Sequence, residues 1–313
     1  MKRFKNILFV VSGAPANRLA LSQAVNLSRQ NYAQLTIMIA ARETPPDWEF
    51  AAVMERHLRE QAEQELAEVV AEFELDAELP KPTIIFKQGE PFIEVVRQAI
   101  SESHDMVVKA ADPTEDRSRI GFVSMDMHLF RKCPCPIWLF KPHKNSSDKL
   151  RLMAAIDPSH ENETSLELTR KIMELSTSLR ERLPNSSLDV LHAWSYEHED
   201  TLTHNPFLRV PEERLAELVE EAKVAQRRAF DESLVAFDLA PDSVESLFLK
   251  GPPTEVIPET IKERNTDILV MGTVARTGIQ GLLIGNTAET ILRHTDCSVL
   301  AVKPKGFTTP VTP

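Results

Sequence analysis

Cys135-Pro-Ile-Trp-Leu-Phe-Lys-Pro142 and Cys297-Ser-Val-Leu-Ala-Val-Lys-Pro304 decide the fold of this chain, since one stretch lies over the other at an offset of 162 residues (297 − 135). Both are short apolar runs, and each is predicted to be the β-strand that closes a domain. Similarity at a fixed spacing is the signature of a duplicated unit. The 313 residues are enough for two domains of about 150 residues, each with its own core.

The repeat extends upstream of these strands. The same offset carries Gly89-Glu-Pro91 onto Gly251-Pro-Pro253 and Asp105-Met-Val-Val108 onto Asp267-Ile-Leu-Val270. The copies thus align without a gap from Gly89 to Pro142, and chance does not easily produce an alignment of this length. We therefore predict two copies of one domain joined head to tail.

Near the start of each copy the offset is smaller. Ile7-Leu-Phe-Val-Val-Ser12 lies over Leu152-Met-Ala-Ala-Ile-Asp157 at an offset of 145 (157 − 12), so the second copy contains 17 additional residues (162 − 145). We place them in the polar segment Ser195 to Val210, before a helix that Pro211 opens. Because this segment follows a strand at its carboxyl end, we expect it to lie near a ligand site as a loop or flap.

Short apolar runs alternate with longer helical stretches within each copy, which indicates βαβ units and a parallel sheet. Continuous apolar runs are typical of strands buried on both faces. Apolar residues at helical spacing predict helices over Trp48 to Phe73 and Phe92 to Ile100. The predicted strands are Asn6 to Val11, Leu35 to Ala40, Thr83 to Phe86, Asp105 to Val108, Ile137 to Phe140, Leu152 to Ile156, Leu188 to His192, Val244 to Leu249, Ile268 to Met271 and Val299 to Val302.

The predicted fold class is α/β, with two tandem doubly wound domains that each contain a five-stranded parallel sheet flanked by helices. We predict the first domain over residues 1–144 and the second over residues 150–305, with a hydrophilic boundary between them. The tail, Gly306 to Pro313, contains three Thr and two Pro and is predicted to be disordered.

Composition argues against several classes of protein. A net charge of −11 opposes binding to the phosphate backbone of nucleic acids. No apolar stretch approaches the roughly 20 residues that cross a bilayer, and the run after Met1 is too short for a signal peptide. Three cysteines fit a reducing compartment better than a disulfide framework. We therefore expect a cytoplasmic protein with no nucleic-acid partner and no membrane span.

Ligands of open parallel sheets bind beyond the carboxyl ends of the strands, where the strand order reverses. After its fourth strand the second copy reads Gly272-Thr-Val-Ala-Arg-Thr-Gly278 and Ile-Gln-Gly281-Leu-Leu-Ile-Gly285-Asn-Thr287, and then a helix begins. Glycines let backbone N–H groups approach an anion, and a helix N-terminus adds donors and a positive dipole end. The loop therefore predicts a phosphate site. The alternative needs no ligand, because Asn286 and Thr287 lie where a helix cap would be.

This loop resembles that of the universal stress proteins, which carry a G-x2-G-x9-G-(S/T) signature here. Gly272 and Gly285 match its first and third glycines, whereas Ala275 replaces the second glycine. Asn286 replaces the hydroxyl residue, although Thr287 follows directly. The tandem layout looks most like the E-type members of the family.

Asp157, at the end of the first strand of the second copy, matches the acidic position that this family places beside the nucleoside. Its alternative role is that of a turn residue before Pro158. The resemblance implies a Rossmann-like, adenine nucleotide alpha hydrolase-like fold and a non-enzymatic stress-response regulatory protein. The implied ligand is ATP or a related adenine nucleotide, with Mg²⁺ accompanying it. The implied site residues are Asp157, Pro158, His192, Gly272, Thr273, Ala275, Arg276, Gly278, Gly285, Asn286 and Thr287.

Family members without the tandem arrangement dimerise through their closing strands. The resemblance therefore implies that the strands at Ile137 to Phe140 and Val299 to Val302 pair, which would make an intramolecular pseudo-dimer. Pairing two related edges also removes an aggregation hazard. Further dimerisation of the whole chain stays open.

The first copy departs from the glycine pattern and is predicted to have a degenerate site. Acidic residues at Asp112, Glu115 and Asp116 lie where phosphates would bind, and like charges at short range oppose binding. Arg117 and Arg119 offset part of this acidity, so a different anionic ligand stays open there. Ala110, Val123, Ser124 and Ser12 stand where the second copy has Gly272, Gly285, Asn286 and Asp157.

Other chemistry finds little support in the sequence. Cys133-Pro-Cys135 lacks the spacing of zinc pairs and of thioredoxin-like motifs, so local packing is the favoured interpretation. His192, His198 and His204 fix no metal geometry, and no metal site is predicted. No nucleophile, base and orienting group can be nominated, so at most a slow ATP hydrolase is expected. The alternative function is a tandem protein that has lost ATP binding and holds another small or amphipathic ligand or a protein partner. Ala275 and the insertion favour it.

Overall fold

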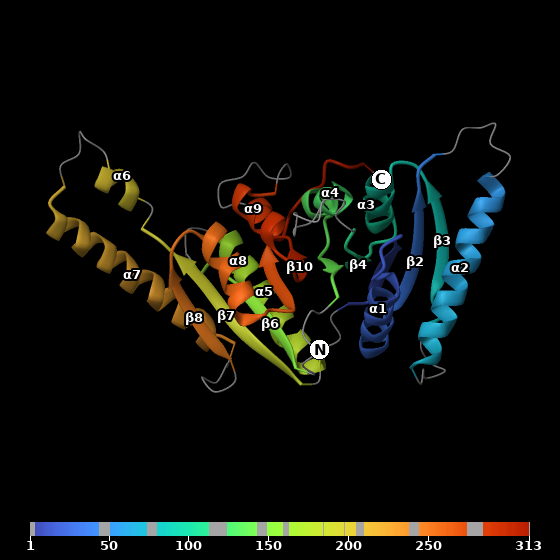
Figure 1. Cartoon of the computed structure of the whole chain (residues 1–313), viewed down its shortest axis with the longest axis horizontal. Coiled ribbons are helices and arrows are strands. Elements are labelled where there is room, and N and C mark those ends of the chain that lie inside the picture. Colours follow the sequence, from blue (N-terminus) through green and yellow to red (C-terminus); the bar gives the residue numbers. More distant parts are fainter. Residues whose placement is uncertain are drawn as a thin grey trace. The chain divides into compact units, whose positions relative to one another are not determined.

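The computed structural model describes residues 4–43, 51–73, 80–112, 124–142, 149–158, 163–183, 185–196, 198–204, 210–237, 244–273 and 284–312. Within these ranges the chain forms ten strands and nine helices (Figure 1). Strands and helices largely alternate along the chain, and neighbouring strands mostly run parallel. The predicted α/β fold class is confirmed.

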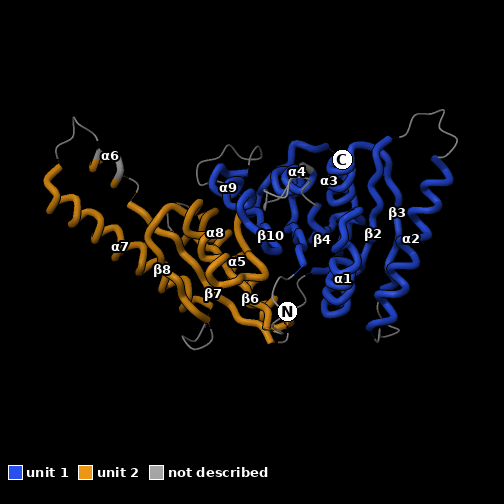
Figure 2. The backbone as a smooth tube through the Cα atoms, in the orientation of Figure 1, with its two compact units in different colours: residues 1–146, 273–313 blue, residues 147–272 orange. Residues whose placement is uncertain are grey.

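The chain divides into two compact units (Figure 2). Unit 1 contains residues 1–146 and 273–313, and unit 2 contains residues 147–272. This division does not follow the repeat, because the last helix and the last strand of the second copy belong to unit 1. The domain limits 1–144 and 150–305 describe the repeat, not the compact units, and they stay a prediction.

Unit 1 has the strand order β3-β2-β1-β4-β5-β10, in which β10 is antiparallel to β5 and the other pairs are parallel. The order reverses at β1, so the switch point lies between β1 and β4. Its strands are β1 (Asn6–Val11), β2 (Gln34–Ala41), β3 (Thr83–Gln88), β4 (Met106–Ala110), β5 (Ile137–Phe140) and β10 (Ser298–Val302). Its helices are α1 (Asn17–Asn31), α2 (Ala51–Ala71), α3 (Pro91–Ser101), α4 (Ser124–Lys132) and α9 (Asn286–His294).

Unit 2 has the parallel strand order β8-β7-β6-β9, with its switch point between β6 and β9. Its strands are β6 (Leu150–Ala155), β7 (Ser186–Trp194), β8 (Glu245–Lys250) and β9 (Ile268–Gly272). Its helices are α5 (Glu163–Arg182), α6 (Glu199–His204), α7 (Glu212–Val235) and α8 (Pro253–Arg264). The predicted strands all exist, and most differ from these bounds by one or two residues at either end.

The repeated Gly-x-Pro stretches have a structural explanation in the turn after the third strand of each copy. Gly89 and Gly251 have φ angles of +151° and +143°, which side chains rarely adopt. The amide of Gly89 donates to Ala41 O and that of Gly251 to Trp194 O, both at 2.9 Å. A Cβ atom would come within 2.9 Å of Glu94 at the first position and within 2.8 Å of Val256 at the second. The repeat therefore preserves a backbone conformation.

Asp105 and Asp267 have the same structural role. Asp105 was predicted to begin a strand, but β4 begins at Met106. The Asp105 carboxylate accepts hydrogen bonds from the amides of Lys5 (2.6 Å) and Asn6 (3.1 Å), at the start of β1. Asp267 accepts one from the Arg151 amide (2.8 Å), in β6. Each aspartate thus satisfies backbone donors beside the strand, instead of opening the strand itself.

The two copies pair through their closing strands, as predicted. Strand β10 runs antiparallel to β5 with Val299 opposite Leu139 and Leu300 opposite Trp138, all inside unit 1. Two lysines at the ends of these strands reach across to the other copy's last helix. Lys141 Nζ donates to Thr295 O (3.0 Å), after α9, and Lys303 Nζ donates to Phe130 O, in α4. The tandem domains form an intramolecular pair.

Two sequence predictions need correction. The insertion contains helix α6, whose Glu199 forms an ion pair with Lys250 (2.7 Å) at the carboxyl end of β8, so this part is not a loop. That the insertion lies near a ligand site stays a prediction. The tail is ordered where it is described, since Arg97 Nε donates to Thr312 O (3.2 Å). Polar composition missed both because the order of these segments depends on contacts with residues distant in the sequence.

Candidate functional site

The unit 1 part of the predicted site lies between β10 and the start of α9. Thr273 donates its amide to Val302 O (3.2 Å) and accepts a hydrogen bond at its carbonyl from the Gly285 amide (3.0 Å). Its side chain is fully buried, and Oγ1 has no hydrogen-bond partner among the described residues. A buried hydroxyl without a partner costs about 1–3 kcal/mol. It therefore points to a polar group that the described residues do not supply.

Helix α9 begins without a side-chain cap. Gly285 is its N-cap residue, with φ −63° and ψ 143°, and no capping hydrogen bond from a side chain is made in the described part of the chain. Asn286 and Thr287 are the first two helical residues and are exposed. The capping interpretation of these two residues was wrong, because they lie inside the helix. Backbone amides in this first turn are suited to an anion.

The unit 2 part of the predicted site follows β6 and β9. Asp157 is half-buried two residues after the end of β6, where its carbonyl accepts a hydrogen bond from Thr169 Oγ1 (2.8 Å), and Pro158 is buried. Gly272 ends β9, and a Cβ atom there would meet Leu168 Cδ2 of α5 at 2.7 Å. A side chain at this position would therefore require Leu168 to shift.

His192 lies in the core of unit 2. Its side chain is 2% exposed, with Nδ1 3.2 Å from Ile156 O and Nε2 3.2 Å from Gln226 Oε1. The rings of Phe230 and Phe248 lie within 6 Å of it, at 5.9 and 5.8 Å between centroids. Both ring nitrogens are thus engaged inside the protein. Ala275, Arg276 and Gly278 lie outside the described residues.

In the first copy a buried ion pair occupies the equivalent region. Lys109 Nζ, on β4, lies 2.9 Å from Asp126 Oδ1, in the first turn of α4, and 2.5 Å from Asp112 Oδ1. It also donates to Ala110 O (2.9 Å), and Asp126 Oδ2 accepts from the Asp112 amide (2.9 Å). The protein's own carboxylate therefore sits at the start of the helix, where an anionic ligand would bind.

This ion pair is withdrawn from solvent. Burial raises the pKa of the Asp126 carboxyl to about 6, although the Lys109 ammonium opposes part of that rise and the Asp112 carboxylate adds to it. A buried charge is retained only with close partners and hydrogen bonds. Lys109 and Asp126 are not among the predicted site residues. The available signal was a lysine inside the apolar strand run Met-Val-Val-Lys-Ala, since lysine is rarely buried unless paired.

The second copy cannot form the same pair, because Met271 and Ala288 stand at the positions of Lys109 and Asp126 by the offset of 162 residues. Its fourth strand and last helix therefore have no internal carboxylate at these positions. The difference between the copies is one of charge as well as of glycine content.

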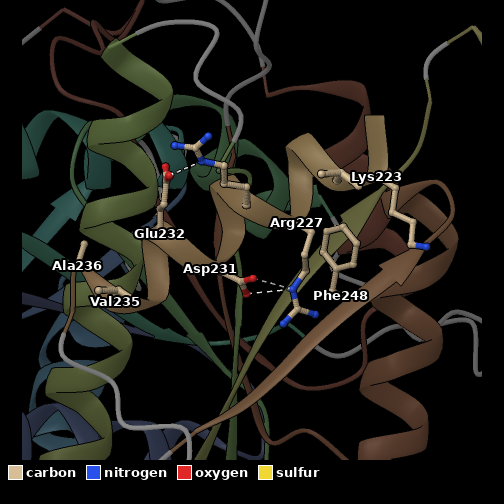
Figure 3. Close-up of a pocket in the computed structure, with 9 residues that line it drawn as sticks. Lys223, Arg227, Asp231, Glu232, Val235, Ala236 and Phe248 are labelled. Carbon is tan, nitrogen blue, oxygen red and sulfur yellow. Dashed lines mark hydrogen bonds and ion pairs between the residues drawn. The ribbon is translucent and has the colours of Figure 1, made fainter. Parts of the chain in front are cut away.

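A shallow groove of about 920 Å³ lies elsewhere on unit 2, between α7 and the edge strand β8 (Figure 3). Arg227 faces Asp231 through two Nε contacts of 3.0 Å, and its guanidinium lies 5.4 Å from the Phe248 ring centre. None of the lining residues is a predicted site residue. These groups already neutralise one another, so the groove shows no preference for a charged ligand.

Within the described ranges, no helix combines the length and apolarity needed to cross a bilayer. No group of three or more His, Cys, Asp or Glu residues suited to a metal ion occurs among the same residues.

The sequence pattern of the universal stress protein family matches this chain twice, at residues 3–141 and 150–303. Universal stress protein E of Photorhabdus laumondii subsp. laumondii is 23% identical over 324 residues, covering 99% of this chain and 98% of that protein. The universal stress protein E homolog of Haemophilus influenzae is 26% identical over 312 residues, covering 96% and 98%. The similarity to universal stress protein E thus extends over nearly the full chain.

Solved structures share the fold. The functionally unknown protein PA1789 from Pseudomonas aeruginosa PAO1 superimposes with a TM-score of 0.68 at 19% identity, covering 97% of this chain and 94% of that one. A universal stress protein from Archaeoglobus fulgidus gives a TM-score of 0.61 at 16% identity, covering 95% and 98%. At these identities the likeness shows the fold alone. With the family pattern present in both copies, the chain belongs to the universal stress protein family.

Proposed function

We propose that this protein is a cytoplasmic stress-response regulatory protein that binds one adenine nucleotide, ATP or a close relative, through its second copy. The two copies differ in charge at the start of the last helix, and this difference decides which copy binds the nucleotide. In the first copy the Asp126 carboxylate takes the position at the start of α4, bonded to Lys109 and to the Asp112 amide. In the second copy Ala288 leaves the corresponding position to a ligand. This asymmetry is the observation that carries the proposal.

The unit 1 residues fit a phosphate group. Thr273 Oγ1 supplies a buried hydroxyl that has no partner among the described residues, and α9 begins at Gly285 without a side-chain cap. A phosphate oxygen would accept hydrogen bonds from that hydroxyl and from amides of the first helical turn. Asn286 and Thr287 are exposed there and would contact the same phosphates.

The nucleoside would be held by the residues that the family resemblance assigns to it, namely Asp157 and Pro158. The carboxylate of Asp157 is suited to accept hydrogen bonds from ribose hydroxyls. His192 would support this region from the core, since its ring nitrogens are engaged by Ile156 and Gln226. Mg²⁺ would enter with the phosphates, which supply its oxygen ligands.

The proposed activity is binding, and no residue is assigned to hydrolysis. Native mass spectrometry of freshly purified protein tests it directly. We expect to observe the mass of the chain plus one adenine nucleotide. If the protein is purified without nucleotide, we expect calorimetric titration with ATP to show one site per chain. A different bound mass, or no site for ATP, would transfer the function to another small or amphipathic ligand or to a protein partner.

A further inference from the structure

Cys133 and Cys135 bring two thiols together between α4 and β5, inside unit 1. Their sulfur atoms are 3.5 Å apart, and both cysteines are reduced. The third cysteine, Cys297, corresponds to Cys135 in the second copy, but Thr295 stands where Cys133 would be. The thiol pair is therefore specific to the first copy, and it has no part in the nucleotide site proposed above.

The backbone holds the two sulfur atoms opposite each other. Each cysteine precedes a proline, Pro134 or Pro136, and a residue before proline is restricted to extended conformations. The Cys133 amide donates to Leu129 O of α4, and Pro136 O accepts from the Val107 amide of β4, both at 2.9 Å. With both ends anchored, forming an S–S bond would cost little further conformational entropy. The sulfurs would approach by about 1.5 Å to reach the bond length of a disulfide.

The two cysteine residues differ in exposure. Cys133 is completely buried, whereas Cys135 is partly exposed. A small oxidant from solution would therefore meet Cys135 first. Cys133 lies directly behind it, at a distance from which it can resolve an oxidised Cys135.

The surroundings favour a negative charge on Cys133 over one on Cys135. The pKa of the Cys133 thiol is lowered, first by the hydrogen bond from Cys135 and further by the Lys303 ammonium, against burial that raises it. The pKa of Cys135 is raised by its hydrogen bond to Cys133 and by burial. Lys303 Nζ is itself held between Phe130 O and the Phe307 ring, 4.6 Å from the ring centre. The first proton that leaves the pair therefore leaves its charge on Cys133.

We propose that Cys133 and Cys135 form an oxidation site for small hydroperoxides. As the Cys135 sulfur attacks the terminal peroxide oxygen, its proton passes to the Cys133 thiolate. An S–O bond forms, the O–O bond breaks, and the leaving alkoxide takes a proton from solvent. Cys133 then attacks the Cys135 sulfenic acid, so that an S–S bond forms, the S–O bond breaks and water leaves. In total, one dithiol and one hydroperoxide give one disulfide, one alcohol (water from hydrogen peroxide) and one water.

The full chain itself provides the internal control for the test. Tryptic cleavage after Lys132 and after Arg293 places the thiol pair in one peptide and Cys297 in another. After treatment with hydrogen peroxide and alkylation, we expect the first peptide to lose two hydrogen atoms and to resist alkylation until a reductant is added. It should react several-fold faster than the buried Cys297, which has Thr295 where the first copy has Cys133. A pair that oxidises no faster than Cys297, or that stops at separate sulfinic acids, would overturn the proposal.

Variants separate the two roles. Cys133→Ser should leave a Cys135 that is oxidised to sulfenic and sulfinic acid without a disulfide, whereas Cys135→Ser should leave a buried Cys133 that reacts slowly. Lys303→Met should move the oxidation rate profile to higher pH, while Lys141→Met, the matched lysine of the first copy, should not. Equal profiles for the two lysine variants would remove Lys303 from the site. Fast disulfide formation in either serine variant would show that other cysteines react, and would refute the assignment.

Discussion

Lys109 Nζ lies 2.9 Å from Asp126 Oδ1, with the two side chains 1% and 0% exposed. The pair joins β4 to the first turn of α4 in the first copy. Met271 and Ala288 stand at the same positions of the second copy. One duplicated fold thus contains an internal charge pair in one half and an apolar pair in the other, which is why we assign ligand binding to only one half.

Breaking this pair should be costly. We expect Lys109→Met to lower the free energy of unfolding by about 3–5 kcal/mol, because it leaves a buried carboxylate without its cation. The double variant Lys109→Met, Asp126→Leu should recover most of that loss. The matched control is Lys223→Met, whose partner Glu220 is an exposed residue on the same helix, and it should cost less than about 1 kcal/mol. Urea unfolding measures all three, and equal losses in the two single variants would contradict the burial argument.

The same carboxylate should make stability depend on pH. The pKa of Asp126 is raised to about 6 in the folded chain from 3.8, chiefly by burial, so the folded state holds the proton more tightly than the unfolded state. Stability that this group contributes is therefore present at low pH and is lost as the pH rises through 6. Between pH 7 and pH 5 we expect wild type to gain about 1 kcal/mol relative to Asp126→Asn. Denaturant unfolding curves of both proteins at pH 7 and pH 5 measure this difference. A loss of wild-type stability relative to Asp126→Asn at pH 5 would contradict the prediction.

Gly285→Val should abolish nucleotide binding, because a side chain at the start of α9 would fill the space that a phosphate needs. The N-cap φ of −63° is open to any residue, so backbone strain contributes nothing. The expected stability loss of about 1–3 kcal/mol comes instead from crowding at a buried position. Gly13→Val is the matched control, since a Cβ atom there meets nothing within 4 Å. Calorimetric titration with ATP should show the site in the control and not in Gly285→Val.

The converse substitution, Val123→Gly, should not create a second site. The Lys109–Asp126 ion pair would remain at the start of α4, and the sequence would keep the acidic residues Asp112, Glu115 and Asp116, of which the last two lie outside the described residues. Two ATP sites in this variant would refute the explanation from internal charge.

Arg131 and Glu289 should couple the two copies. Arg131 Nη2 of α4 lies 2.6 Å from Glu289 Oε1 of α9, and this guanidinium is the first cause of the lowered pKa of Glu289. A double-mutant cycle with Arg131→Gln and Glu289→Gln should give about 0.5–1 kcal/mol of coupling at pH 7. Because the folded pKa lies below 4.5, the coupling is present above that pH and is lost as the pH falls through the folded value. Coupling that persisted in acid would not be electrostatic.

Gly89→Ala and Gly251→Ala should destabilise the chain by similar amounts, about 1–3 kcal/mol each, since both residues have positive φ and no room for a Cβ atom. Gly13→Ala, in open space, should change stability by less than about 1 kcal/mol. Thermal unfolding compares the three variants. A clear difference between Gly89→Ala and Gly251→Ala would show that the two turns are not equivalent.

Much of this protein follows from sequence alone. Buried parallel strands need continuous apolar runs, and turns with positive φ need glycine, so the repeat, the βαβ order and the Gly-x-Pro turns are visible as local patterns. The pairing of β5 with β10 followed from family resemblance, and the register confirms it.

The tertiary structure decided what depends on distant partners. Helix α6 in the insertion and the ordered tail make contacts with residues distant in the sequence, among them Glu199 with Lys250 and Arg97 with Thr312, that no local pattern encodes. The charge pair that fills the first copy joins residues 17 positions apart, and each looks unremarkable until β4 and α4 bring them together. Composition and spacing determine which elements form, because backbone geometry is local. Which side chains meet is determined by packing, because burial makes a charge depend on the partner that the fold places beside it.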